Sequence, residues 1–208
     1  MERGARDDVE TAMNTDWEQR YRTGDMPWEK GAAHPAIVEF LQREPMRGRV
    51  FVPGCGTGHD VRAIAATAVE VVGLDIAPSA ITAAKSQPLV GGERYLLGDL
   101  FALPAEMRGA FDWVVEHTCF CAIPPTMRAD YVRAVASVLK PGGRLFAVFY
   151  MTPDMESGEQ GPPFGTNAPE LDKFFAPYFT TEKKWVPATT YAGREKRELC
   201  RVLVRRSS

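Results

Sequence analysis

The 208-residue sequence predicts an α/β fold, a doubly wound and mostly parallel seven-stranded sheet that closes with an antiparallel C-terminal strand. Three observations support this. Short apolar runs alternate with helical patterns from residue 49 to residue 150, a glycine-rich turn follows the first run, and two strand-like runs close the chain. Strands joined by helices of this length pair in parallel through right-handed crossovers, with helices on both faces. A ligand is therefore expected beyond the carboxyl ends of the strands, at the switch point.

The expected elements follow in order. A short helix begins near Trp17, with Thr15 or Asp16 as its cap, and breaks at Gly24 and Pro27. The pattern then predicts helices over 34–43, 60–68, 78–85 and 125–139 and strands over 49–52, 70–75, 94–99, 111–120 and 144–150. After a loop, a helix over 168–179 and two strands, roughly 179–189 and 196–206, form an antiparallel pair at the sheet edge.

Composition excludes several classes of function. Hydrophobic residues make up 45% of the chain and charged residues 25%, which suits one domain spanning residues 1–208. The net charge of −2 indicates no general attraction to nucleic acid or to an anionic membrane. No apolar run is long enough to span a bilayer, and the polar N-terminus lacks the apolar core of a signal peptide. Four cysteines without C-x-x-C spacing indicate reduced thiols in a cytoplasmic protein.

The stretch GCGTGHD, residues 54–60, forms the turn between the first strand and its helix. Such turns occur in dinucleotide, nucleoside and phosphate sites, but the G-K-[ST] ending of a nucleotide-triphosphate loop is absent, and the spacing is not G-x-G-x-x-G. Asp75 and Asp99 close the next two strands. Asp75 can accept hydrogen bonds from two ribose hydroxyls, and Asp99, followed by Leu100, from an adenine amino group.

An adenosine flanked by carboxylates, without a lysine or arginine in the turn, favours a ligand that lacks phosphates. We therefore expect the turn to hold S-adenosylmethionine by close backbone approach at Gly54 and Gly56. The alternative interpretation is a tight glycine turn with aspartates that merely end two strands.

Six stretches carry a family resemblance: WEQRYRTGDMPWEKG (17–31), VPGCGTGHDV (52–61), VVGLDIAPSAI (71–81), EHTCFCAIPPTMR (116–128), LKPGGRLFAVFY (139–150) and GPPF (161–164). With them the chain resembles class I S-adenosylmethionine-dependent methyltransferases, which have a Rossmann-like fold. More narrowly, it is similar to the thiopurine methyltransferase family, on its halide/thiol methyltransferase branch. The first stretch, FCAIPP and GPPF are the specific ones.

The resemblance implies that residues 1–45 form a helical N-terminal lid over the cofactor and that the protein is a monomer. It also implies cofactor contacts from Trp17, Tyr21, Trp28, Gly54, Gly56, Asp75, Ile76, Asp99, Leu100 and His117. The chain departs from the family pattern at two positions. Tyr21 replaces a frequent tryptophan, and His117 stands where plant halide enzymes have tyrosine and mammalian thiopurine enzymes arginine.

The chemistry of methyl transfer suits an aromatic lid. Transfer from a sulfonium to an anion destroys charge, so a dry pocket favours it, and aromatic faces attract the cation. Trp17, Tyr21 and Trp28 could line one helical face, although core aromatics of an amphipathic helix would show the same spacing.

His117 is the candidate catalytic residue, as a cofactor or substrate contact or as a base; the alternative is a half-buried histidine that bonds a backbone carbonyl. Trp28, Phe120 and Phe164 are the candidate substrate contacts. Cys119 and Cys121 give an incomplete ligand set, so no metal is expected, and we interpret them as pocket or core thiols.

Together these features predict an enzyme that transfers the methyl of S-adenosylmethionine to a small soft nucleophile: a thiol, hydrosulfide, thiocyanate or halide. A bulky aromatic thiol, small-molecule O- or N-methylation, and non-catalytic cofactor binding stay open as alternatives. The expected partner is a small-molecule acceptor. Nucleic acid is not expected, because the (N/D)-P-P-(Y/F) motif is absent and the basic C-terminal run is interleaved with glutamates.

Overall fold

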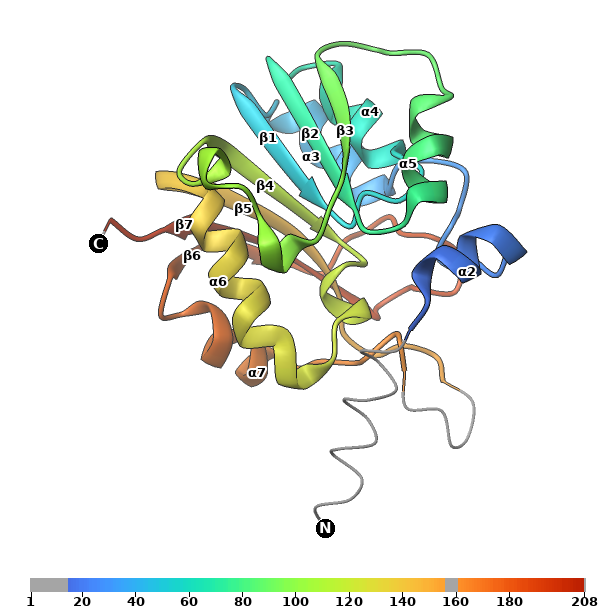
Figure 1. Ribbon diagram of the computed structural model, residues 1–208. Coiled ribbons are helices and arrows are strands. Elements are labelled where there is room, and N and C mark those ends of the chain that lie inside the picture. Colours follow the sequence, from blue (N-terminus) through green and yellow to red (C-terminus); the bar gives the residue numbers. More distant parts are fainter. Residues whose placement is uncertain (1–14, 156–160, 208) are drawn as a thin grey trace.

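The computed structural model describes residues 15–155 and 161–207 (Figure 1). In this part of the chain, seven strands form one sheet in the order β3-β2-β1-β4-β5-β7-β6. The first five pair in parallel, and β7 runs antiparallel to both β5 and β6. The expected doubly wound sheet and its antiparallel C-terminal strand are thus confirmed. The strands are β1 (Arg49–Pro53), β2 (Glu70–Asp75), β3 (Glu93–Leu97), β4 (Phe111–His117), β5 (Leu139–Tyr150), β6 (Phe179–Trp185) and β7 (Glu198–Arg205).

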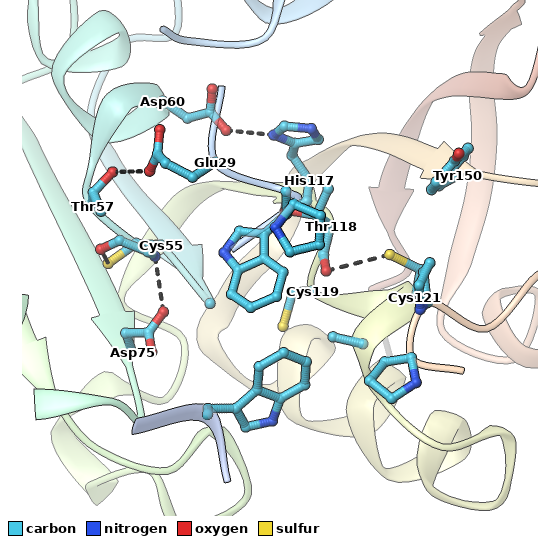
Figure 2. A pocket seen from close by; sticks show the side chains of 18 of the residues that line it. Glu29, Cys55, Thr57, Asp60, Asp75, His117, Thr118, Cys119, Cys121 and Tyr150 are labelled. Atoms are coloured by element: carbon cyan, nitrogen blue, oxygen red, sulfur yellow. Dashed lines mark hydrogen bonds and ion pairs between the residues drawn. The ribbon is translucent and has the colours of Figure 1, made fainter. Parts of the chain in front are cut away.

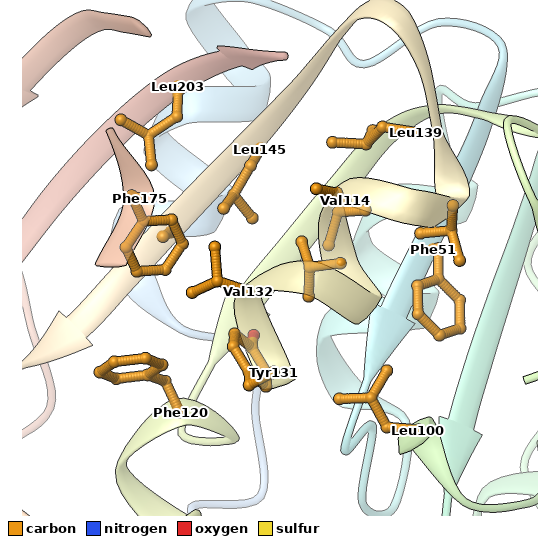
Figure 3. Close-up of a cluster of buried hydrophobic side chains, with 14 of the residues drawn as sticks. Phe51, Leu100, Val114, Phe120, Tyr131, Val132, Leu139, Leu145, Phe175 and Leu203 are labelled. Carbon is orange, nitrogen blue, oxygen red and sulfur yellow. The ribbon is translucent and has the colours of Figure 1, made fainter. Parts of the chain in front are cut away.

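Helices cover both faces of the sheet, and alternate strand residues point to each. On one face, α3, α4 and α5 pack against residues such as Val50, Val52 and Val148. On the other, α6 and α7 pack against Phe51, Val114 and their neighbours (Figure 3). The α-helices are α2 (Trp17–Thr23), α3 (Pro35–Arg43), α4 (His59–Ala65), α5 (Pro78–Lys85), α6 (Arg128–Val138) and α7 (Ala168–Phe175). None of the helices in the described ranges is long and apolar enough to cross a membrane.

The lid helix α2 has the limits that its sequence predicts. The Asp16 side chain accepts a hydrogen bond from the Gln19 N–H at 2.8 Å, and Gly24 ends the helix in a left-handed conformation. Residues 1–14 of the predicted N-terminal lid lie outside the described residues.

Several predicted boundaries differ from the structure. The elements expected over 60–68, 111–120, 168–179 and 179–189 end three or four residues earlier, and two further elements begin at other residues than expected. The helix expected from Pro125 begins at Arg128, because Pro124 and Pro125 lack backbone donors and Pro125–Met127 form a 3-10 turn instead. The strand expected from Arg144 already begins at Leu139, which pairs with Phe111. Residues 140–143 then bulge out before Arg144 resumes the pairing opposite Trp113.

Candidate active site

A cavity of about 550 Å³ opens at the carboxyl ends of β1, β2 and β4. This is the switch point of the sheet, because β2 and β4 pair with β1 on its two opposite sides. The volume falls within the roughly 300–1,000 Å³ of small-molecule sites. The structure brings all the predicted cofactor-binding residues together on this cavity: Trp17, Tyr21, Trp28, Gly54, Gly56, Asp75, Ile76, Asp99, Leu100 and His117.

The glycine turn after β1 has no room for side chains at two of its positions. Gly54 has φ +59°, and a Cβ there would lie 2.9 Å from the Cys119 Sγ. Gly56 has φ +53°, and a Cβ there would lie 3.0 Å from the Tyr21 hydroxyl. Both the backbone conformation and the close neighbours therefore require glycine. The turn exposes backbone to the cavity at the point where a ligand has to approach closely.

Asp75 lies at the end of β2 and is 8% exposed. Its Oδ2 accepts the Gly56 N–H at 2.8 Å and its Oδ1 the Ala77 N–H at 2.9 Å. Burial raises the pKa of this carboxyl above its ordinary value, although the hydrogen bonds from Ala77 and Gly56 act in the opposite direction. Each oxygen keeps a further lone pair with which to accept a ligand hydroxyl.

The third strand supplies the far wall of the cavity. The Asp99 carboxylate caps a 3-10 turn, Leu100–Ala102, by accepting the Phe101 N–H at 2.8 Å. Leu100 is buried beneath it, whereas Ile76, after β2, is 55% exposed. These residues give this part of the cavity wall two apolar side chains and a carboxylate.

The three lid aromatics lie on the cavity and are half-buried, so the alternative that they are core residues does not hold. The Trp28 ring packs edge-on against Trp17, with centroids 5.5 Å apart, and against Tyr21 at 5.8 Å. Trp28 Nε1 donates to the Tyr21 hydroxyl at 3.3 Å. The cluster forms an aromatic wall of the cavity beside the glycine turn, because the Tyr21 hydroxyl lies against Gly56.

Two carboxylates attach the lid to the sheet domain. Glu18 of α2 accepts from the Ser79 N–H at 2.8 Å and from its hydroxyl at 2.6 Å, at the start of α5. Glu29 accepts from the Thr57 hydroxyl, and its other oxygen lies 3.0 Å from His59 Nε2 (Figure 2). The lid is thereby held against two helix N-termini, where negative charge is favoured.

His117 ends β4 and meets Asp60 of α4 (Figure 2). Its Nδ1 lies 2.7 Å from the Asp60 Oδ2, and the histidine side chain is 8% exposed. Burial raises the pKa of Asp60, but the charge and hydrogen bond of His117, with the His34 N–H, outweigh burial and hold it below the ordinary value. The partner of His117 is thus a carboxylate and not the backbone carbonyl considered above.

Three thiols line the cavity: Cys55, Cys119 and Cys121. Burial raises the pKa of Cys55 and of Cys119 well above the ordinary value and that of Cys121 to about 12. All three are therefore neutral at physiological pH and contribute a weakly polar wall, not nucleophiles.

Two predicted substrate contacts lie elsewhere. Phe120 is 2% exposed and packs against Tyr131, Phe149 and Phe175 in the core (Figure 3). A 3-10 turn, Phe120–Ala122, directs it away from the cavity. Phe164 is also buried and does not line the cavity, whereas the preceding Pro162 and Pro163 do. Trp28 is the only one of the three predicted substrate contacts on the cavity wall.

The sequence interpretation missed many cavity residues, among them Glu29, Asp60, Tyr150, Tyr191 and Arg194. Asp60 directly follows the glycine turn, so its position near the ligand could have been inferred. Tyr191 and Arg194 come from the loop between β6 and β7, which carries no motif; the Arg194 guanidinium lies 4.4 Å from the Tyr150 ring centroid.

The sequence profile described as Thiopurine S-methyltransferase matches residues 12–197. The chain belongs to this family. Family membership, the glycine turn and the class I methyltransferase sheet together make it an S-adenosylmethionine-dependent methyltransferase.

Named relatives of this methyltransferase include two plant enzymes. Thiocyanate methyltransferase 1 of Brassica oleracea is 32% identical over 197 residues, covering 90% of this chain and 84% of the plant protein. Probable thiol methyltransferase 2 of Arabidopsis thaliana is 35% identical over 167 residues, covering 77% and 71%. Among solved structures, the Burkholderia thailandensis 1,6-didemethyltoxoflavin-N1-methyltransferase with bound S-adenosylhomocysteine superposes with a TM-score of 0.71 at 18% identity, covering 95% and 88%. That likeness establishes the shared fold.

Proposed function

We propose that this methyltransferase transfers a methyl group by direct in-line displacement to a small soft nucleophile: a thiol, hydrosulfide, thiocyanate or halide. The observation that carries the proposal is the composition of one continuous cavity. Its wall combines a cradle for adenosine, with the carboxylates of Asp75 and Asp99, and neutral thiols and apolar side chains that would contact the acceptor.

The residues of the cradle fit S-adenosylmethionine, which supplies an electrophilic methyl group on a cationic sulfur when it is bound. Asp75 would hold the ribose hydroxyls, and Asp99 with Leu100 and Ile76 the adenine. The backbone at Gly54 and Gly56 allows close approach, since a Cβ at either glycine would collide with its neighbours. The aromatic wall of Trp17, Tyr21 and Trp28 would face the sulfonium.

The acceptor end of the cavity is weakly polar. Cys119, Cys121, Ile123, Pro162 and Pro163 line it. Such walls strip water from a soft nucleophile and align it with the methyl group, which lowers the barrier to transfer. Because one cavity of about 550 Å³ has to hold both reactants, a small acceptor fits best. The plant relatives named for thiocyanate and thiols support this choice, and a bulky aromatic thiol is the alternative.

The test is an acceptor panel. Purified enzyme and S-adenosylmethionine are combined separately with iodide, thiocyanate, hydrosulfide, ethanethiol, an aromatic thiol, a phenol and an amine. Methylated products and S-adenosylhomocysteine are both quantified, and the Asp75→Ala variant serves as the control for turnover outside the cavity. We expect turnover with the small soft nucleophiles. Turnover of the aromatic thiol alone favours the alternative, and turnover of the phenol or amine alone contradicts the proposal.

A further inference from the structure

The contact between Asp60 and His117 decides which nitrogen of the histidine carries a proton. Asp60 is a carboxylate and can only accept, so the ring nitrogen 2.7 Å from it, Nδ1, has to donate. The other oxygen of Asp60 accepts the His34 N–H at 2.8 Å, which fixes the carboxylate in place. In a neutral imidazole held this way, Nε2 presents a lone pair.

That lone pair has no partner. Within residues 15–155 and 161–207, His117 Nε2 is buried and makes no hydrogen bond, although the side chain lines the cavity. A buried polar atom left unpaired is costly and calls for an explanation. The cavity is where a proton donor could reach the ring.

The neighbouring His34 gives an internal comparison. Its ring lies 4.6 Å from that of His117, but its Nδ1 accepts the Ala36 N–H at 3.1 Å, so its proton belongs on Nε2. That nitrogen faces the Glu198 Oε2 at 2.9 Å. Like His117 Nε2, this nitrogen is buried without a hydrogen bond, but it has a carboxylate oxygen as its neighbour, whereas His117 has a polar partner only on the Asp60 side.

The other groups that face the His117 ring leave Asp60 as its carboxylate partner. His34 and Tyr191, whose ring centroid is 5.9 Å away, pack against the ring. Burial lowers the pKa of His34 and raises that of Tyr191, so both are neutral at physiological pH. Glu116, the preceding residue on β4, points to the opposite face and accepts from the Phe120 N–H and the Tyr131 hydroxyl.

We propose that Asp60 is a positioning residue that holds His117 in the Nδ1–H tautomer, so that Nε2 takes the proton of an acceptor bound as a neutral thiol. This deepens the proposed function and rests on it. The S–H proton passes to Nε2 while the sulfur lone pair forms the new S–CH₃ bond. The electron pair of the broken C–S bond stays on the sulfur of S-adenosylhomocysteine, and the imidazolium later returns its proton to water.

The substrate class follows. A free cysteine thiol has a pKa near 8.5, and that of a simple alkanethiol is higher, so both are mostly protonated at neutral pH and gain from a base. Iodide and thiocyanate carry no proton, so the lone pair of His117 Nε2 does not assist their methylation. The acceptor that this site favours is therefore a protonated thiol.

The test compares Asp60→Asn with a matched control, Asp112→Asn. Asp112 also accepts a backbone N–H, from Arg49 at 2.8 Å, but lies at the opposite end of β4. With ethanethiol, Asp60→Asn should lower kcat about 100-fold with little change in KM, and Asp60→Glu should restore part of the loss. With thiocyanate, or with a nitrothiophenol that is ionised at neutral pH, the same variant should stay within threefold of the wild type. Asp112→Asn should match the wild type throughout.

A second readout does not depend on activity. In the ¹⁵N-labelled protein without ligands, the ring shifts should show Nδ1–H at His117 and Nε2–H at His34, with His117 assigned from His117→Gln. The side-chain amide introduced by Asp60→Asn can donate to Nδ1, so this variant should move the proton to Nε2. Thermal unfolding of both Asp→Asn variants checks that they fold, and if Asp60→Asn does not fold, the ring shifts of the wild type alone decide the tautomer.

The proposal is overturned by an equal loss with ethanethiol and with the ionised acceptor, or by Nε2–H at His117 in the wild type. A wild-type enzyme that methylates thiocyanate or iodide but no neutral thiol also overturns it and leaves the proposed function standing. A wild-type enzyme that methylates only a phenol or amine contradicts the proposed function, and the tautomer measurement then decides the role of Asp60 separately.

Discussion

The Asp75 carboxylate accepts the Gly56 N–H at 2.8 Å and thereby joins the end of β2 to the turn that leaves β1. A single side chain thus shapes the glycine turn and lines the cavity next to it. Because the carboxyl is buried, the backbone hydrogen bonds have to compensate for its lost hydration. Removing it is expected to affect both the turn and the ligand.

Asp75→Ala should weaken S-adenosylmethionine binding by at least the ~1–3 kcal/mol of a hydrogen bond to a charged group. This loss of affinity has two sources: the ribose contact is removed, and the Gly56 N–H of the glycine turn loses its hydrogen-bond acceptor. Titration calorimetry measures the affinity, and Asp112→Asn, away from the cavity, should bind like the wild type. An unchanged affinity in Asp75→Ala contradicts the assignment.

Trp28→Ala should lower both turnover and cofactor affinity while the protein stays folded, because Trp28 is half-buried on the cavity wall. The matched control is Trp185→Ala. Trp185 is half-buried too, but it lies on the edge strand β6, stacks on Phe40 and Phe146, and does not line the cavity. Its loss should lower the melting temperature and leave the cofactor Kd unchanged. Wild-type kinetics in Trp28→Ala would assign that residue a packing role only.

Gly54→Ala should destabilise the protein and weaken cofactor binding, because its Cβ would meet the Cys119 Sγ at 2.9 Å. Gly142→Ala separates steric collision from backbone strain: its φ is +74°, but nothing lies within 4 Å of the added Cβ. The free energy of unfolding of this control should therefore fall only by the ~1–2 kcal/mol that a left-handed conformation costs an alanine. Denaturant unfolding and calorimetry give both quantities, and equal losses in the two variants would show that the turn has room for a side chain.

Sequence patterns predicted the fold well where local chemistry sets the boundaries. The strand over 70–75 and the helix over 78–85 have the limits that were expected, since an apolar run ends at Asp75 and Pro78 starts the helix. The gathering of the expected cofactor residues of the sheet (Gly54, Asp75, Asp99 and His117) at one cavity was also predictable. They follow successive parallel strands, and the carboxyl ends of such strands meet at one edge of the sheet.

The acceptor side depended on packing that the sequence does not display. The 3-10 turn after β4 points Phe120 into an aromatic cluster with Phe149 and Phe175, and no local pattern distinguishes that direction from the cavity. The Asp60–His117 contact joins residues 57 positions apart. It arises because α4 begins beside the end of β4, a proximity that only the strand order provides.

Glu29 gives the lid a pH-dependent attachment. Burial raises the pKa of its carboxyl, but hydrogen bonds from Thr57 and the Gly31 N–H, with the charge of His59, hold it below 4.5. A lowered pKa in the folded state means that the contact stabilises the lid above pH 4.5 and is lost as the pH falls through that lowered value.

The cofactor affinity of the wild type should therefore fall on acidification below pH 4.5, with a matching change in tryptophan fluorescence from the lid. Glu29→Gln should show the weaker affinity already at pH 7 and lose this part of the acid dependence, because a neutral amide does not titrate. Glu39→Gln is the control: Glu39 pairs with Arg43 on the outside of α3, far from the Glu29 contacts, and should titrate like the wild type. A Glu29→Gln profile that follows the wild type at every pH would show that the lid is held without this carboxylate.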